Sequence, residues 1–107
     1  MALTRDFRET IRERAQREPA FRQALLREGI ELMTSGDFDT GRAILRNYIN
    51  ATIGFIELAR KTQIPSPSLQ RMFGPKGNPS AVNLFGVIAA LQKAEHVNVE
   101  LQLHPAT

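Results

Sequence analysis

Apolar residues recur at helical spacing over most of the chain, and this pattern predicts an all-α protein. The expected helices span residues 4–17, 19–35, 40–51, 55–62, 67–73 and 80–94. The side chains expected to face the core are Phe7, Ile11 and Ala15 in the first helix; Phe21, Ala24, Leu25, Leu32 and Met33 in the second; Ile44, Leu45, Tyr48, Ile49 and Thr52 in the third; and Ala81, Leu84, Phe85, Ile88 and Leu91 in the last.

Proline, glycine and aspartate mark the boundaries of these helices. Pro19 suits the first turn of the second helix, and Gly36 ends it. Asp37 or Asp39 can cap the helix that follows. A calcium loop starting at Asp37 is excluded, because Tyr48 stands where the bidentate glutamate of such a loop would be.

The last segment changes period. Apolar residues alternate with polar ones from Val97 to His104, which predicts a half-buried strand over residues 97–104. A lone strand leaves its backbone groups unpaired, and no other segment of the chain reads as a strand. We therefore expect a partner strand from another chain, most simply in a homodimer whose pairing direction stays open.

Composition narrows the class of protein. The 107 residues suffice for a single domain over 1–107, divided into N-terminal helices (1–36), a core (39–95) and the strand. The absence of cysteine excludes disulfides and thiolate metal sites. No apolar run approaches the roughly 20 residues of a membrane span, and the charged start from Met1 to Phe7 does not resemble a signal peptide. We expect a cytoplasmic protein without membrane contact.

Charge is unevenly distributed. The net charge is +3. Seven arginines face six acidic residues up to Gly36, which favours a solvated first helix or, alternatively, an arm that grips a partner protein. From Gln63 to Glu95 there are three basic residues and one acidic residue, as expected of a surface that lies on phosphates.

The stretch from Phe55 to Phe73 has the features of a helix-turn-helix unit. Two short helices that cross steeply need a small residue at the close approach, an apolar plug after the turn and a buried residue in the second helix. Ala59, Ile64 and Leu69 meet these needs in that order, while Phe55 and Leu58 anchor the first helix.

The second helix of this unit carries the candidate base readers. Ser66 is expected to cap it, with Pro67 at the first helical position. With Leu69, Met72 and Phe73 turned inward, the remaining side chains point outward. Gln pairs with adenine and Arg with guanine through two hydrogen bonds each. The residues expected to contact DNA here are Ser66, Ser68, Gln70 and Arg71.

The loop over residues 74–80 allows two interpretations. Its two glycines could bring backbone N–H groups to a phosphate, with Lys76 adding charge, or the loop could be an ordinary inter-helix turn. We include Lys76 and Asn78 among the candidate DNA contacts. Ser80 or Asn78 is expected to cap the last helix.

The residues from about Leu45 to Leu91 resemble the lambda-repressor-like helix-turn-helix superfamily. Gly77-Asn78-Pro79 after a short recognition helix resembles a narrower group, the HigA-type addiction-module antidotes, or antitoxins. The resemblance implies a dimeric repressor of its own operon that binds double-stranded operator DNA and neutralises a RelE/ParE-like toxin. Gln63 departs from the pattern, because many members have glycine there. A left-handed backbone would strain glutamine, so a looser turn is expected.

Other functions have less support in the sequence. His96 is expected to end a helix, His104 to be solvated and Tyr48 to lie in the core. No set of nucleophile, base and orienting group is visible, so we expect neither an enzyme nor a metal or other cofactor. The alternative to a sequence-specific transcriptional regulator is a protein-interaction module that neutralises a partner without binding DNA itself.

Overall fold

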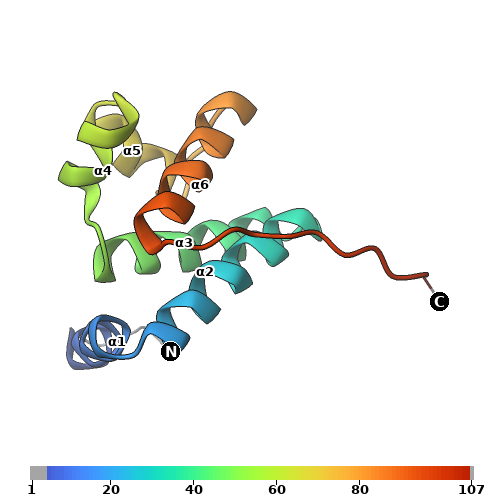
Figure 1. Ribbon diagram of the computed structural model, residues 1–107. Helices are drawn as coiled ribbons and strands as arrows, with labels where there is room; N and C mark the ends of the chain where they lie inside the picture. The colour runs from blue at the N-terminus through green and yellow to red at the C-terminus, as the bar shows by residue number, and fades with distance from the viewer. Residues whose placement is uncertain (1–4, 107) are drawn as a thin grey trace.

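The computed structural model describes the backbone of residues 5–106 and the side chains of residues 10–106. The described part of the chain forms six helices and no strand (Figure 1). The helices are α1 (Arg5–Arg17), α2 (Pro19–Thr34), α3 (Phe38–Ala51), α4 (Phe55–Thr62), α5 (Ser66–Met72) and α6 (Ala81–Glu95). The all-α prediction is confirmed, and each boundary observed lies within two residues of the expected one. The expected start at Thr4 and the side chain of Phe7 lie outside what is described.

Helix α3 lies in the middle of the molecule. Helices α1 and α2 lie on one side of it, and α4, α5 and α6 lie on the other (Figure 1). Helix α1 packs on both α2 and α3, while α4 packs on both α5 and α6. Buried side chains from α2 to α6 form one continuous core.

Helix ends follow the capping residues in the sequence. The Asp37 carboxylate accepts a hydrogen bond from the N–H of Thr40 at 3.3 Å, so Asp37 rather than Asp39 caps α3. Ser80 rather than Asn78 caps α6, accepting from the N–H of Asn83 at 3.2 Å. His96 ends α6 in the left-handed conformation, and Tyr48 is buried in the core as predicted.

Helices α2 and α3 meet through glycine. A Cβ atom added to Gly29 would lie 2.7 Å from the Leu45 side chain, and one added to Gly41 would lie 2.7 Å from the Gly29 carbonyl oxygen. Both distances are shorter than carbon contacts allow, so the two backbones approach as closely as they do only because neither residue has a side chain. The sequence pattern did not indicate that these two glycines form part of the interface.

Two predicted core faces need correction. In α2 the fully buried positions are Leu26, Gly29 and Ile30, whereas Ala24 is exposed. The close approach at Gly29 turns that side of the helix toward α3. In α6, Leu84, Ile88 and Leu91 face inward as expected, but Val87 is also buried.

The aromatic residue predicted for the α6 core stripe lies outside it. Phe85 is 63% exposed, and Ala81 is exposed as well. Because α6 packs through Val87, Ile88 and Leu91, the side of the helix that carries Phe85 is largely exposed. Helix α6 is apolar on more than its buried side, so its sequence pattern did not single out the side that packs.

The strand expected over residues 97–104 does not form within the single chain. Residues 97–106 are extended without strand pairing, and they run past α3 to end clear of the helices (Figure 1). Val97 packs against the core, and the N–H of Val99 donates to the Gln92 side-chain oxygen at 2.8 Å. A ladder needs a second extended segment, and the described chain offers none.

The six helices are too short or too polar to cross a lipid bilayer. This statement covers the residues that the structure describes.

Candidate nucleic-acid interface

A three-residue connection joins α4 to α5. Gln63, its first residue, has φ 62° and ψ 22°, the left-handed conformation that glycine adopts most easily. Its N–H donates to the Ala59 carbonyl at 2.9 Å, and its side-chain amide donates to the Arg60 carbonyl at 2.9 Å. Gln63 therefore takes up the conformation that glycine would have, with some strain, in place of the looser turn expected.

The predicted packing of this unit is present. Leu58 and Leu69 are fully buried, and Ala59 and Ile64 are partly buried against the same core. The rings of Phe55 and Phe73 lie 6.3 Å apart at a tilt of 50°, a favourable aromatic contact that joins the start of α4 to the end of α5.

Helix α5 begins one residue earlier than predicted. Its first residue is Ser66 and its N-cap is Pro65, so the Ser66 hydroxyl does not cap the helix. That hydroxyl instead accepts a hydrogen bond from the Gln70 side-chain amide at 3.2 Å. Pro67 stands at the second helical position, where its missing N–H still costs no helical hydrogen bond.

The four candidate contacts on α5 form two hydrogen-bonded pairs: Gln70 with the partly buried Ser66, and Arg71 with the partly buried Ser68. Gln70 and Arg71 are exposed, while Leu69 and Met72 on the same helix are buried. A guanidinium nitrogen of Arg71 donates to the Ser68 hydroxyl at 3.2 Å, one turn away. The serines thus hold the two longer side chains along the helix surface, with donors left over for a ligand.

The glycine N–H groups of the loop over residues 74–80 are already used. The N–H of Gly74 donates to the Arg71 carbonyl at 3.1 Å, and that of Gly77 donates to the Gly74 carbonyl at 3.0 Å. The structure therefore favours the inter-helix turn over a phosphate clamp built from these two groups. Lys76 and Asn78 remain exposed on the loop.

Glycine is required at position 77 by a close approach. A Cβ atom there would lie 2.1 Å from the Met72 carbonyl oxygen and 2.4 Å from that of Arg71. The loop thus folds back onto the last turn of α5, and this contact keeps Lys76 and Asn78 beside the end of that helix.

Arg42 of α3 binds the same loop, a role that the sequence pattern did not indicate. The residue is only 7% exposed. Its guanidinium donates to the Pro75 carbonyl at 2.8 Å and to the Gly77 carbonyl at 3.0 Å, and it lies 3.1 Å from Asp39. No local pattern distinguishes this arginine from the exposed Arg46 one turn later, because its partners come from a loop more than thirty residues away.

The segment that contains α5 has an excess of basic residues. Between Phe55 and Ala94 the chain has five basic residues and one acidic residue, Glu57. Arg60 forms a hydrogen-bonded ion pair with Glu57, and this hydrogen bond lowers the pKa of the Glu57 carboxyl. Lys61, in the last turn of α4, is exposed and lies outside that pair. Lys61 was not among the candidate contacts predicted from the sequence, although its place in a short basic turn could have suggested it.

The described side chains do not assemble a metal site. No group of three or more histidine, aspartate or glutamate residues among them could hold an ion. A partly buried polar cluster joins Tyr48, Glu95 and Arg22: the tyrosine hydroxyl donates to one carboxylate oxygen at 2.5 Å, and the guanidinium donates to the other at 2.7 Å. Burial, followed by the hydrogen bond to Glu95, raises the pKa of Tyr48 well above its usual value. All three side chains are satisfied, which is typical of a structural cluster.

The chain matched no protein-family model, no curated protein and no solved structure.

Proposed function

We propose that this protein is a sequence-specific regulator that binds double-stranded DNA through a helix-turn-helix unit formed by α4 and α5. Helix α5 would enter the major groove, where Gln70 and Arg71 would read base edges. Ser66 and Ser68 would position these two side chains or contact the sugar–phosphate backbone.

One observation carries the proposal. Leu69, Met72 and Phe73 are buried while Gln70 and Arg71, between them, are exposed. A helix anchored through one face and presenting paired hydrogen-bonding side chains on the other has the form that groove recognition requires. The excess of basic residues from Phe55 to Ala94 adds attraction for phosphates.

The loop after α5 supplies backbone contacts in this proposal. Lys76 would neutralise a phosphate beside the end of the recognition helix, and Arg42 would act at a distance by fixing the loop through its carbonyl groups. Because the glycine N–H groups are used within the loop, the charge of Lys76 is the main contribution expected there.

The test is binding to DNA from upstream of the protein's own gene, measured by fluorescence anisotropy over a range of salt concentrations. We expect affinity to fall steeply with salt, because phosphate contacts release counterions. Arg71→Ala should cost about 1–3 kcal/mol and relax preference at one base pair. Arg27→Ala, which removes an exposed arginine from α2, should leave binding unchanged.

Lys76→Ala separates phosphate contact from base reading. It should weaken binding to all sequences alike and reduce the salt slope by about 1. If Arg71→Ala left operator affinity and preference as they are, the base-reading role would be wrong. Binding that is absent at low salt would overturn the DNA-binding proposal as a whole.

The resemblance to HigA-type antidotes extends the proposal to a biological role. The protein would be a cytoplasmic antitoxin that represses its own operon as a dimer and neutralises a RelE/ParE-like toxin. A gene for a short basic protein next to this one, whose product arrests growth unless this chain is co-expressed, would support that role. Growth arrest that this chain fails to relieve would contradict it.

A protein-interaction module is the second candidate, and a groove favours it. Helices α3, α4 and α6 border an open groove of about 1010 Å³. Its apolar floor includes Ile53, Ile64 and Leu91, and Lys61 and Lys93 contribute charge. A partner segment with apolar and acidic residues would fit this lining. If this function stood alone, Lys93→Glu would abolish partner binding while DNA binding remained undetectable at any salt concentration.

A further inference from the structure

The tail over residues 97–106 exposes an apolar row. Leu101 is 81% exposed and Leu103 is 96% exposed, whereas Val99, two residues before Leu101, is 37% exposed. No hydrogen bond joins the backbone of residues 100–106 to any other residue that the structure describes. The tail therefore combines exposed leucines with unpaired backbone groups. Both features cost free energy, and pairing with a second strand would remove that cost.

The bond at Val99 shows which edge of the tail is free. In an extended chain, the N–H and C=O of one residue point to one edge, and those of the next residue point to the other. The N–H of Val99 points to Gln92 on α6, so the backbone groups of Leu101 and Leu103 belong to the same inner edge. The outer edge is formed by the backbone groups of Asn98, Glu100, Gln102 and His104.

We propose that this outer edge pairs with the same segment of a second copy, in an antiparallel two-stranded ribbon whose twofold axis passes through Leu101. The proposal concerns how two copies associate, and it does not depend on DNA binding.

Repulsion between like charges disfavours two of the possible arrangements, and apolar pairing favours the one proposed. Parallel pairing in register would bring the two Glu100 carboxylates together, and so would antiparallel pairing centred on Glu100, at a cost for like charges. Centring on Leu101 instead places Glu100 opposite Gln102, which can donate to it. It also aligns apolar residues with each other: Leu101 with Leu101, and Val99 with Leu103.

The free edge fits this register. On that edge the even-numbered residues carry the hydrogen bonds, so Glu100 and Gln102 exchange backbone bonds across the axis. The two Leu101 residues then form the closely spaced, non-hydrogen-bonded pair, with Cα atoms about 4.5 Å apart. This spacing is within the range of about 4.4–6.8 Å that a disulfide spans.

Cysteine crosslinking tests the arrangement directly, because the chain has no cysteine of its own. Under mild oxidation, Leu101→Cys should form a covalent dimer and Leu103→Cys should not. Mixing Val99→Cys with Leu103→Cys should give a crosslinked heterodimer. Equal crosslinking of Leu101→Cys and Leu103→Cys alone would overturn the antiparallel direction. Crosslinking of Leu101→Cys only when mixed with Leu103→Cys would overturn the register.

Light scattering on the full chain tests the interface without crosslinks. Leu101→Glu should raise the dimer dissociation constant by more than about tenfold, because it places two carboxylates across the axis. Its helical circular dichroism should not change, since the residue lies outside the helices. Val82→Glu, at a residue 83% exposed on α6, is the matched control and should remain dimeric. A monomeric wild-type chain, or dissociation by Val82→Glu alone, would overturn the proposal.

Discussion

Two arginines connect α2 and α3 to the other half of the molecule, and they do so with different chemistry. Arg22 of α2 binds the carboxylate of Glu95 at the end of α6, whereas Arg42 of α3 binds two carbonyl groups in the loop before α6. The carboxylate side chain is only 4% exposed, while the acidic neighbour of Arg42, Asp39, is 86% exposed.

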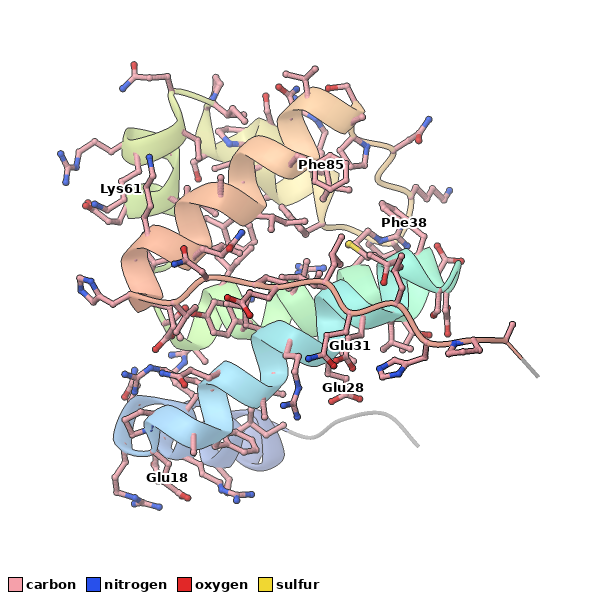
Figure 2. All side chains as sticks on the ribbon, turned by 45° about the vertical axis from the view of Figure 1, so that its right-hand side comes forward. Glu18, Glu28, Glu31, Phe38, Lys61 and Phe85 are labelled. Carbon is pink, nitrogen blue, oxygen red and sulfur yellow. The ribbon has the colours of Figure 1, made fainter. Side chains whose placement is uncertain are left out.

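The difference concerns what remains when one partner is removed. Removing either charge of the Arg22–Glu95 pair leaves the other one poorly solvated and without its counterion, whereas a loop carbonyl that loses Arg42 is left neutral. We infer that the Arg22 contact is the more sensitive to substitution and that the Arg42 contact acts mainly to place the loop. Figure 2 shows the described side chains on the six helices.

The largest effect is expected at Glu95. Glu95→Gln keeps the size of the side chain but leaves Arg22 without its counterion, and it should lower the free energy of unfolding by about 3 kcal/mol. This is the lower end of the usual cost, because Arg22 is partly exposed. Urea unfolding followed by circular dichroism measures it. Glu31→Gln, in an exposed pair with Arg27 on α2, should change stability by less than about 0.5 kcal/mol. Equal losses in the two variants would remove the distinction between the sites.

A smaller loss is expected at Arg42. Arg42→Ala should lower the free energy of unfolding by about 2 kcal/mol, because two charged hydrogen bonds and the packing of the side-chain stem are lost. Arg42→Lys should recover only part of this, since an ammonium lacks the planar fork that reaches both carbonyl groups. The matched control is Arg46→Ala on the exposed face of the same helix. Full recovery by lysine would show that charge alone is needed.

The smallest effect is expected at Tyr48, and it depends on pH. Tyr48→Phe should cost about 1–2 kcal/mol at neutral pH, through the lost bond to Glu95. Because burial raises the pKa of Tyr48 in the folded state, its stabilisation is complete below about pH 10, the pKa of an unfolded tyrosine, and is lost as the pH rises further. Urea midpoints at pH 9, 10 and 11 should therefore fall more steeply for the wild type than for Tyr48→Phe. Parallel curves would contradict the raised pKa.

Local patterns in the sequence predicted where the helices lie better than they predicted which residues pack against them. Apolar spacing, Pro19 and Asp37 were enough to place six helices, because each signal acts within a few residues. The inward and outward faces of α5 were also predicted correctly, since Leu69, Met72 and the adjoining Phe73 are apolar and most of the other residues are polar.

Contacts between distant segments could not be predicted in this way. Arg42 and Glu95 are charged residues for which the sequence favours exposure, and only the folded chain brings their partners to them. Phe85 was assigned to the core because α6 is apolar around most of its circumference. The capping role given to Ser66 failed because the helix begins at that residue, a shift of one position that sequence patterns do not resolve.

The glycines at positions 29, 41 and 77 have a consequence for genetic screens of this protein. Each lies where an added methyl group would collide with a neighbouring atom, and none is among the residues proposed to contact DNA. A library scored by reporter repression would rank these three positions as severely as Arg71, although their loss would act through the amount of folded protein. Measuring cellular abundance alongside repression would separate residues that build the domain from residues proposed to read the operator.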